Sequence, residues 1–247
     1  MTIHILGAAG WIPGTNETSC IMVEHNDMLF LLDAGTGAAN IKNYESVLSK
    51  YNTVHLLLSH YHLDHLIGLI YLSPFLRNKH IKIYGPGKMA YPETTDYYLH
   101  ALLRNEFYSR SIDRFSQDVQ IMDFPADTFL IGKTKISVKK QLHSAASFRI
   151  AMDDKLIYAT DTAFDADAWE GVSAEVLFHE CWAYDQSASD RHTTLWALKN
   201  QLPLASFGKV MLIHHNPVWN SEDYEIIRQM IARTNIYLAE DGMCLAV

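Results

Sequence analysis

Apolar residues in this chain form short runs that end at turn residues, and such runs are typical of buried β-strands. Two of the runs flank the turn His25–Asp27, which predicts a hairpin. We expect strands over Thr2–Leu6, Cys20–Glu24, Met28–Leu32, Val54–Ser59, Ile81–Tyr84, Gln117–Met122, Thr134–Gln141, Phe148–Met152, Leu156–Ala159, Glu175–His179, Lys209–Ile213, Ile236–Leu238 and Met243–Ala246.

Helical periodicity marks several of the segments between these strands. We expect helices over Ala38–Tyr51, Leu66–Leu72, Asp190–Asn200 and Ser221–Arg233. Ser221 is the predicted N-cap of the last helix, and Asp190 or a following threonine is the predicted N-cap of the one before it. Hairpins early in the chain and strand–helix alternation later predict a mixed α/β fold.

Two segments allow both a structural and a functional interpretation. Pro92–Phe115 fits an amphipathic helix packed on a sheet, or a lid or dimer element that brings arginines near a phosphate. Those arginines are Arg104, Arg110 and Arg114. The glycines of Gly7–Thr15 suit a tight strand connection or a close approach to a ligand.

Composition narrows the class of protein. The chain has 247 residues, of which 49% are hydrophobic and 19% charged, with no low-complexity stretch, so we expect one domain over residues 1–247. The net charge of −8 disfavours binding to long nucleic acid. We find no secretory signal and no run long enough to span a bilayer. Cys20, Cys181 and Cys244 are isolated, which suits buried thiols in a reducing cytoplasm.

The densest group of chemically active side chains follows the strand that begins at Val54. His60, His62, Asp64 and His65 come directly after it. Any one of these histidines alone would be interpreted as a surface or core residue. Two histidines spaced two apart in an extended chain project from one face, while the next two residues can serve a neighbouring position. Imidazole and carboxylate are ligands of zinc and other divalent metals, so we predict a site for two ions.

The motif His-x-His-x-Asp-His after an apolar strand resembles that of the metallo-β-lactamase-fold hydrolases. The resemblance implies an αββα sandwich of two mixed sheets flanked by helices. It also implies a first metal held by three histidines, a second held by Asp64 and two histidines, and a bridging aspartate. In chain order these residues are His60, His62, Asp64, His65, His143, Asp161 and His214. The LLDAG-like segment makes Asp33 a structural residue behind the ligands.

Two positions refine this resemblance. A histidine at position 62 favours hydrolysis, because the redox di-iron branch of the fold has glutamate there. His214 is chosen over His215 because Leu-Ile-His-His-Asn-Pro resembles the final ligand motif of the family. Two zinc ions, or manganese ions, would lower the pKa of a shared water so that a bridging hydroxide forms near neutral pH, and Asp64 would orient it.

A second motif concerns the proton that the leaving group needs. His179–Trp182 and Arg191–Thr194 resemble two segments of the tRNA 3′-processing branch. By that resemblance His192 is the general acid and Glu180 the carboxylate that orients it. The alternative is a polar cluster that caps a helix. The pair favours a phosphodiesterase over other hydrolases of the fold.

The substrate is expected to be small and anionic. The tRNA-processing branch inserts a long arm between its third histidine and the bridging aspartate, whereas here the interval is 161 − 143 = 18 residues. Relatives without that arm include cyclic-nucleotide phosphodiesterases, among them anti-Pycsar-like phage enzymes that destroy cyclic pyrimidine-nucleotide immune signals. Aromatic residues that can stack on a base, or simply pack in the fold, are Trp11, Phe164, Trp182 and Tyr184.

Three other hypotheses about function are compatible with the sequence. One is a lactone, ester or thioester hydrolase with the same metal ligands. Another is an RNA 3′-processing endonuclease that lacks the tRNA-binding arm, and the third is a metal-binding scaffold without turnover. The resemblance further implies a homodimer, and we expect a cytoplasmic location with no membrane partner.

Overall fold

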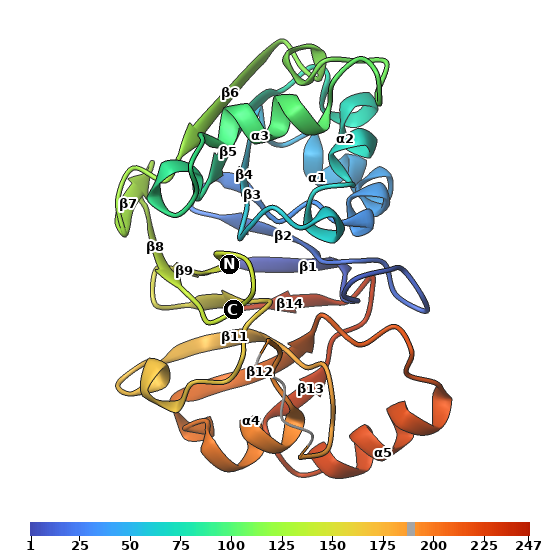
Figure 1. Ribbon diagram of the computed structural model, residues 1–247, viewed down its shortest axis with the longest axis vertical. Coiled ribbons are helices and arrows are strands. Elements are labelled where there is room, and N and C mark those ends of the chain that lie inside the picture. The colour runs from blue at the N-terminus through green and yellow to red at the C-terminus, as the bar shows by residue number, and fades with distance from the viewer. Residues whose placement is uncertain (187–190) are drawn as a thin grey trace.

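Two facing β-sheets form the centre of the fold, and the computed structural model describes them together with the rest of residues 1–186 and 191–247 (Figure 1). Each sheet has seven strands. The first contains, in spatial order, β14 (Cys244–Ala246), β1 (Thr2–Gly7), β2 (Cys20–His25), β3 (Met28–Leu32), β4 (Thr53–Leu57), β5 (His80–Gly85) and β6 (Asp118–Asp123). The second contains β13 (Ile236–Leu238), β12 (Phe207–Ile213), β11 (Ala174–Glu180), β10 (Leu156–Ala159), β9 (Phe148–Met152), β8 (Thr134–Lys140) and β7 (Thr128–Ile131).

Both sheets are mixed. In the first, β14, β1, β2 and β3 pair antiparallel, and β3 to β6 pair parallel. In the second, β7 to β10 pair antiparallel, and β10 to β13 pair parallel. Parallel strands end on the same edge of a sheet, so the side chains that follow β4, β10, β11 and β12 are brought together.

Three apolar layers hold the sheets and helices together. Side chains of both sheets interdigitate in the central layer, where Phe30 and Leu57 meet Phe148 and Tyr158. The outer layers pack the helices on the far faces of the sheets, with α1 to α3 on the first and α4 and α5 on the second (Figure 1). The helices are α1 (Glu45–Leu48), α2 (Leu69–Leu76), α3 (Thr95–Leu102), α4 (Leu195–Gln201) and α5 (Ser221–Ile231). The predicted αββα sandwich is confirmed, and one domain over residues 1–247 stays a prediction.

The helices depart from the sequence prediction more than the strands do. The helix expected over Ala38–Tyr51 is mostly a 3₁₀ helix, Thr36–Tyr44, with only Glu45–Leu48 in α conformation. The backbones of Gly37 and Gly7 lie against each other, and this close approach favours a tighter turn. The helix expected from Leu66 begins at Leu69, because the Gly68 N–H donates to the Ala34 carbonyl and pins the preceding turn.

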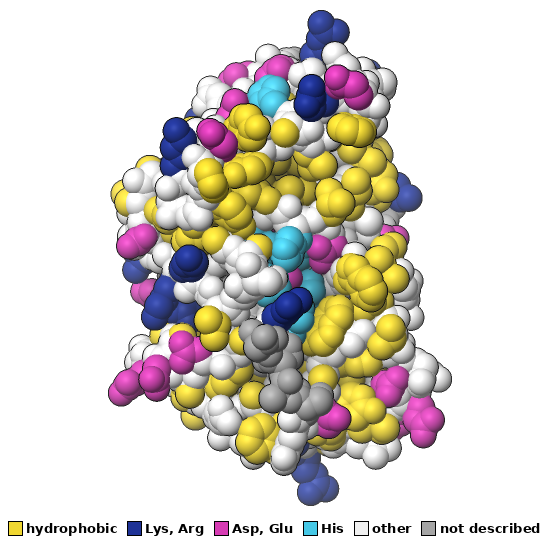
Figure 2. Space-filling view, in the orientation of Figure 1, with side chains coloured by type: hydrophobic (Ala, Val, Ile, Leu, Met, Phe, Trp, Pro, Cys, Tyr) yellow, Lys and Arg dark blue, Asp and Glu magenta, His cyan; other side chains and the backbone are white. Residues whose placement is uncertain are grey.

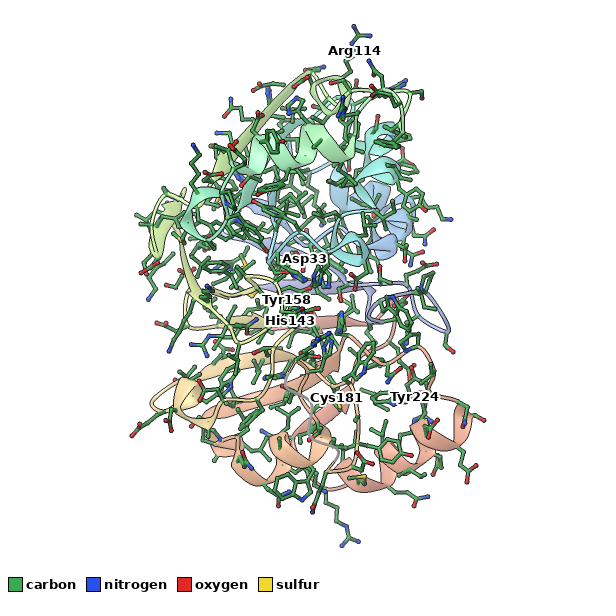
Figure 3. All side chains as sticks on the ribbon, viewed as in Figure 1. Asp33, Arg114, His143, Tyr158, Cys181 and Tyr224 are labelled. Carbon is green, nitrogen blue, oxygen red and sulfur yellow. The ribbon has the colours of Figure 1, made fainter. Side chains whose placement is uncertain are left out.

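The segment Pro92–Phe115 is not one continuous helix. Only Thr95–Leu102 is α-helical, capped by the Thr94 hydroxyl, and the remainder is irregular apart from a 3₁₀ turn at Ile112–Arg114. Two of its arginines have local partners, because Arg110 donates to Ser73 and Arg104 pairs with Glu106, and the lid or dimer interpretation stays a prediction. Figure 3 places Arg114 at one end of the molecule, whereas His143 lies near the middle.

Smaller corrections concern caps, cysteines and one strand. Asn220, not Ser221, caps α5 in a capping box with Asp223. Thr194 caps α4, as one alternative predicted, while Asp190 lies outside the described residues. Cys20 and Cys181 are buried but Cys244 is exposed. Strand β7 was not predicted from sequence. Within the described ranges, none of the helices has the length and apolar character needed to cross a bilayer.

Candidate active site

The candidate site lies where strands of both sheets end, in the middle of one face of the molecule (Figure 1). The first sheet contributes the segment after β4, and the second contributes the segments after β8, β10 and β12. Figure 2 shows imidazoles reaching the surface there, bordered by hydrophobic side chains. All seven residues predicted as metal ligands meet at this point: His60, His62, Asp64, His65, His143, Asp161 and His214.

Three histidines surround one oxygen of Asp161. His60 Nε2 lies 3.6 Å, His62 Nδ1 4.0 Å and His143 Nε2 3.5 Å from Asp161 Oδ2. Ligands at about 2.0 Å from a tetrahedral zinc ion stand roughly 3.3 Å apart. The four atoms therefore form a first cation position of suitable size.

The other oxygen of Asp161 faces a second group. His65 Nε2 and His214 Nε2 each lie 3.0 Å from Asp161 Oδ1. Asp64 Oδ2 lies 3.3 Å from His65 Nε2 and 3.2 Å from His214 Nε2. Asp161 thus stands between two adjacent cation positions, as the sequence predicted for the bridging residue.

The histidines present unprotonated nitrogens to these positions. His60 Nδ1 donates to the Ser59 hydroxyl at 2.9 Å, His65 Nδ1 donates to Asp33 Oδ2 at 2.7 Å, and His143 Nδ1 donates to the Arg191 carbonyl at 2.9 Å. Each Nε2 is then a lone pair that points into the cluster. The Nε2 atoms of His60 and His65 are buried without a hydrogen-bond partner. A divalent cation satisfies such atoms, so the residues fit the predicted metals.

Asp33 lies behind the cluster and joins it to both sheets (Figure 3). Its buried carboxylate accepts hydrogen bonds from the Ser59 N–H and hydroxyl at 2.7 Å each, His65 Nδ1 at 2.7 Å and the Tyr158 hydroxyl at 2.8 Å. Ser59 and His65 belong to the segment after β4, whereas Tyr158 belongs to β10. One carboxylate therefore sets the orientation of imidazoles in both cation positions.

The electrostatics of the cluster call for positive charge. Burial alone would raise the pKa of Asp161, but the imidazoles of His214, His65 and His60 outweigh it and hold the pKa well below its usual range. Burial acts to lower the pKa of His65, yet Asp64, Asp161 and Asp33 raise it well above the usual value. The carboxylates of the cluster therefore favour positive charge between them, and bound cations would supply it in a loaded site.

Unusual backbone conformations aim the side chains at the site. Asp33, Asp161 and His214 have φ of 56°, 45° and 52°, in the left-handed region that non-glycine residues seldom occupy. Asp33 directly follows β3, and His214 directly follows β12. Asp161 comes two residues after the end of β10. The reversal of the backbone turns the side chain away from the strand direction and into the cluster.

Glu180 and His192 meet beside the second position, as predicted. His192 Nδ1 lies 2.8 Å from Glu180 Oε2, and the His192 ring stacks on Trp182 with a centroid distance of 4.7 Å. Glu180 is fully buried, also accepts the Thr162 N–H, and lies 3.9 Å from His214 Nδ1. Burial raises the pKa of Glu180 well above its usual range, and burial lowers that of His192. A ligand nitrogen of His192 lies within 4.8 Å of ligand atoms of both Asp161 and His214.

Other predicted residues lie outside the cluster. His215 is buried and its Nε2 donates to the Leu212 carbonyl, so the choice of His214 over it matches the geometry. Tyr184 hydrogen-bonds to Asp223, and Phe164 packs near His179. Of the candidate stacking residues, only Trp182 contacts the site through its ring among the described residues.

Sequence reasoning missed two backbone contacts. The Arg191 carbonyl orients His143, and the Trp11 N–H donates to Asp64 Oδ2 at 2.8 Å. A main-chain group carries no sequence signature, so neither was predictable. The glycine at position 10 was the one available signal, because a side chain there would overlap the ring of His214.

Residues 1–237 match the family described as Anti-Pycsar protein Apyc1. A ribonuclease Z of Methanopyrus kandleri is 28% identical over 90 residues, which is 35% of this chain and 32% of that protein. The matched part thus spans about a third of that relative's length.

Solved structures are similar over the whole chain. The metallo-beta-lactamase fold protein YhfI from Bacillus subtilis has a TM-score of 0.75 at 17% identity, over 99% of this chain and 98% of that one. A diphosphatase from the PhnP family has a TM-score of 0.71 at 14% identity, over 100% and 97%. The short form of human tRNase Z, ELAC1, has a TM-score of 0.70 at 16% identity, over 100% and 99%. The metallo-β-lactamase fold is thereby confirmed.

Proposed function

This chain belongs to the Anti-Pycsar protein Apyc1 family, and from that premise we propose that it is a metal-dependent phosphodiesterase that hydrolyses a small phosphodiester, with a cyclic nucleotide as the substrate. The observation that carries the proposal is the contact of 2.8 Å between His192 and Glu180 beside a cluster built for two cations. A proton donor next to two cation positions suits a reaction that must expel an alkoxide from an anionic phosphate.

The residues of the cluster take separate roles in this proposal. His60, His62 and His143 would hold one cation, and Asp64, His65 and His214 would hold the other. Asp161 would lie between them. Zinc or manganese ions bound there would make water nucleophilic at neutral pH and offset the negative charge of the phosphate. Asp64 accepts a hydrogen bond from the attacking water and fixes its direction.

His192 delivers the proton to the leaving oxygen. Its Nδ1 lies 2.8 Å from Glu180 Oε2, and we assign the proton transfer to its other ring nitrogen, Nε2. The Trp182 ring holds the imidazole plane, and Glu180 engages Nδ1 and fixes the orientation of the ring. An acid matters most for a sugar hydroxyl, which is a poor leaving group, and this favours a nucleotide ester over an activated ester.

A small substrate agrees with the shape of the segment between His143 and Asp161. It contains only the β9–β10 hairpin, which turns at Asp153 and Asp154. The ribonuclease Z and tRNase Z relatives favour RNA 3′-processing as the second candidate, whereas the net charge of −8 opposes a long RNA. We also propose a homodimer in the cytoplasm, and light scattering tests the oligomeric state.

The test is a substrate panel. Protein loaded with zinc or manganese should hydrolyse 2′,3′- or 3′,5′-cyclic nucleotides and bis-p-nitrophenyl phosphate, but not lactones or thioesters, and chelation should abolish turnover. His62→Ala should lose bound metal and activity, whereas His80→Ala, a surface histidine paired with Asp118, should behave as wild type. Hydrolysis of lactones or thioesters with inert cyclic nucleotides would refute the proposal.

A further inference from the structure

The loop between β1 and β2 rests its backbone on the metal cluster. A side chain at Gly10 would come within 2.4 Å of the His214 ring, so only glycine permits this approach. The next residue, Trp11, donates its N–H to Asp64 Oδ2 at 2.8 Å. The main chain of this loop is therefore fixed directly beside the second cation position.

A half-buried carboxylate, that of Asp241, fastens both ends of the loop. Asp241 Oδ1 accepts the Ala8 N–H at 3.0 Å, and Asp241 Oδ2 accepts the Glu17 N–H at 2.8 Å. The Asp241 N–H donates in turn to the side chain of Asn16 at 3.0 Å. The stem of the loop is thus closed, and its tip cannot move far from the cluster.

The tip itself is apolar, exposed and strained. Trp11 is 62% exposed and Ile12 is 48% exposed. Trp11 has φ of 61°, and a left-handed conformation costs a bulky residue about 1 to 2 kcal/mol. Within residues 1–186 and 191–247, no aromatic ring stacks on its indole. Strain and exposure in one residue beside a site indicate a role that the fold alone does not explain.

The other tryptophan at the site is already engaged. Trp182 stacks on His192 and also packs against His214, with a centroid distance of 5.6 Å. The Trp182 ring is thus already in contact with the proton donor, His192, and with His214. Trp11, whose N–H contacts Asp64 in the cluster, has an exposed indole that can receive a flat ligand.

We propose that Trp11 is a substrate-binding residue whose indole stacks on the base of the phosphodiester, while its main-chain N–H holds Asp64. This inference rests on the proposed phosphodiesterase function and specifies its substrate as one that carries an aromatic base. Stacking of a base on an aromatic side chain is worth about 1 to 3 kcal/mol, which corresponds to about 5- to 150-fold in affinity.

The experiment measures the coupling between the indole and the base in the metal-loaded protein. Dissociation constants of adenosine 5′-monophosphate and of ribose 5-phosphate, which lacks the base, are determined by calorimetry. Trp11→Ala should weaken the nucleotide about 5- to 150-fold and the sugar phosphate less than twofold, and Trp11→Phe should restore most of the loss. Tyr237→Ala, which removes an exposed aromatic from the edge strand β13, is the matched control and should change neither.

Further readouts separate this role from a structural one. Trp11→Gly relieves the strained φ, so its melting temperature should equal or exceed that of wild type while nucleotide binding is lost. Equal weakening of both ligands, no weakening of either, or a change of oligomeric state in Trp11→Ala would overturn the inference. If wild type hydrolyses no phosphodiester at all, the proposed function fails. If it does and Trp11→Ala binds the nucleotide normally, only the role of Trp11 fails.

Discussion

Removal of the His192 imidazole is the most direct test of how the site works. His192→Ala leaves the seven candidate ligands in place, because the His192 ring contacts Glu180, Trp182, His143 and His214 and is not itself one of the seven. Only 19% of the side chain is exposed, so the variant opens a small polar space beside a buried carboxylate. We therefore expect normal metal content together with a loss of catalysis.

The size of the loss depends on the leaving group. General acid catalysis contributes about 10²- to 10⁴-fold, so turnover of a cyclic nucleotide should fall by that factor, which is about 3 to 5 kcal/mol in the barrier. A p-nitrophenolate leaves as its anion and needs no proton, so bis-p-nitrophenyl phosphate should lose less than tenfold. Glu180→Gln keeps the shape but weakens the hydrogen bond that orients His192, and should lie between wild type and His192→Ala.

The assay compares kcat on both substrates, metal content by elemental analysis, and rescue by added imidazole. A proton donor predicts rescue on the cyclic nucleotide and a difference of at least tenfold between the two substrates. Equal losses on both substrates, or cyclic-nucleotide turnover that His192→Ala retains, would refute the assignment. Loss of metal in the variant would show instead that His192 supports the ligands.

Three further perturbations test the cluster and the fold. Asp161→Asn should reduce the metal content, measured by elemental analysis, from two ions to one or none. It should also lower phosphodiesterase turnover at least 100-fold. Two retained ions would contradict the bridging role of Asp161. Asp33→Asn places an amide against four donors and should lower the free energy of unfolding by about 3 kcal/mol in denaturant titrations; an unchanged midpoint would refute this. Burial lowers the pKa of His55 to about 4, below the 6.5 of a histidine in an unfolded chain. The contribution of neutral His55 to the free energy of unfolding is therefore fully present above pH 6.5, and up to about 3 kcal/mol of it is lost as pH drops towards 4. His55→Phe should flatten this acid limb in melts taken across that pH range, and an unchanged slope would exclude His55 as its source.

The candidate site was largely predictable because its residues follow strands. A buried strand is readable from a local apolar run, and parallel strands end on one edge, so His60, Asp161 and His214 were placed together without knowledge of the contacts. The resemblance to the metallo-β-lactamase fold supplied the assignment of each residue to one cation position. It also identified Glu180 and His192, which are far from the cluster in sequence order but meet beside it.

The segments that sequence could not resolve depend on long-range contacts. The helix predicted over Ala38–Tyr51 is distorted because Gly37 packs on Gly7, a pair that no local pattern reveals. Strand β7 pairs only with β8 at the edge of its sheet, and its apolar run is short. The length of Pro92–Phe115 suggested one helix, yet the chain leaves the helix at Leu103, where φ and ψ are −102° and 33°.

The strained backbone of the site is held in place by packing energy from the rest of the fold. Asp33, Asp161, His214 and Trp11 all occupy the left-handed region, at about 1 to 3 kcal/mol each, so several kcal/mol of packing elsewhere are used to hold this geometry. The central layer supplies that energy, and Asp33 transmits it, because its carboxylate links Tyr158 of the second sheet to Ser59 and His65 of the first. Separation of the sheets would therefore release both cation positions at once. Bound metal must in turn oppose separation of the sheets, since a ligand that binds only the folded state stabilises it.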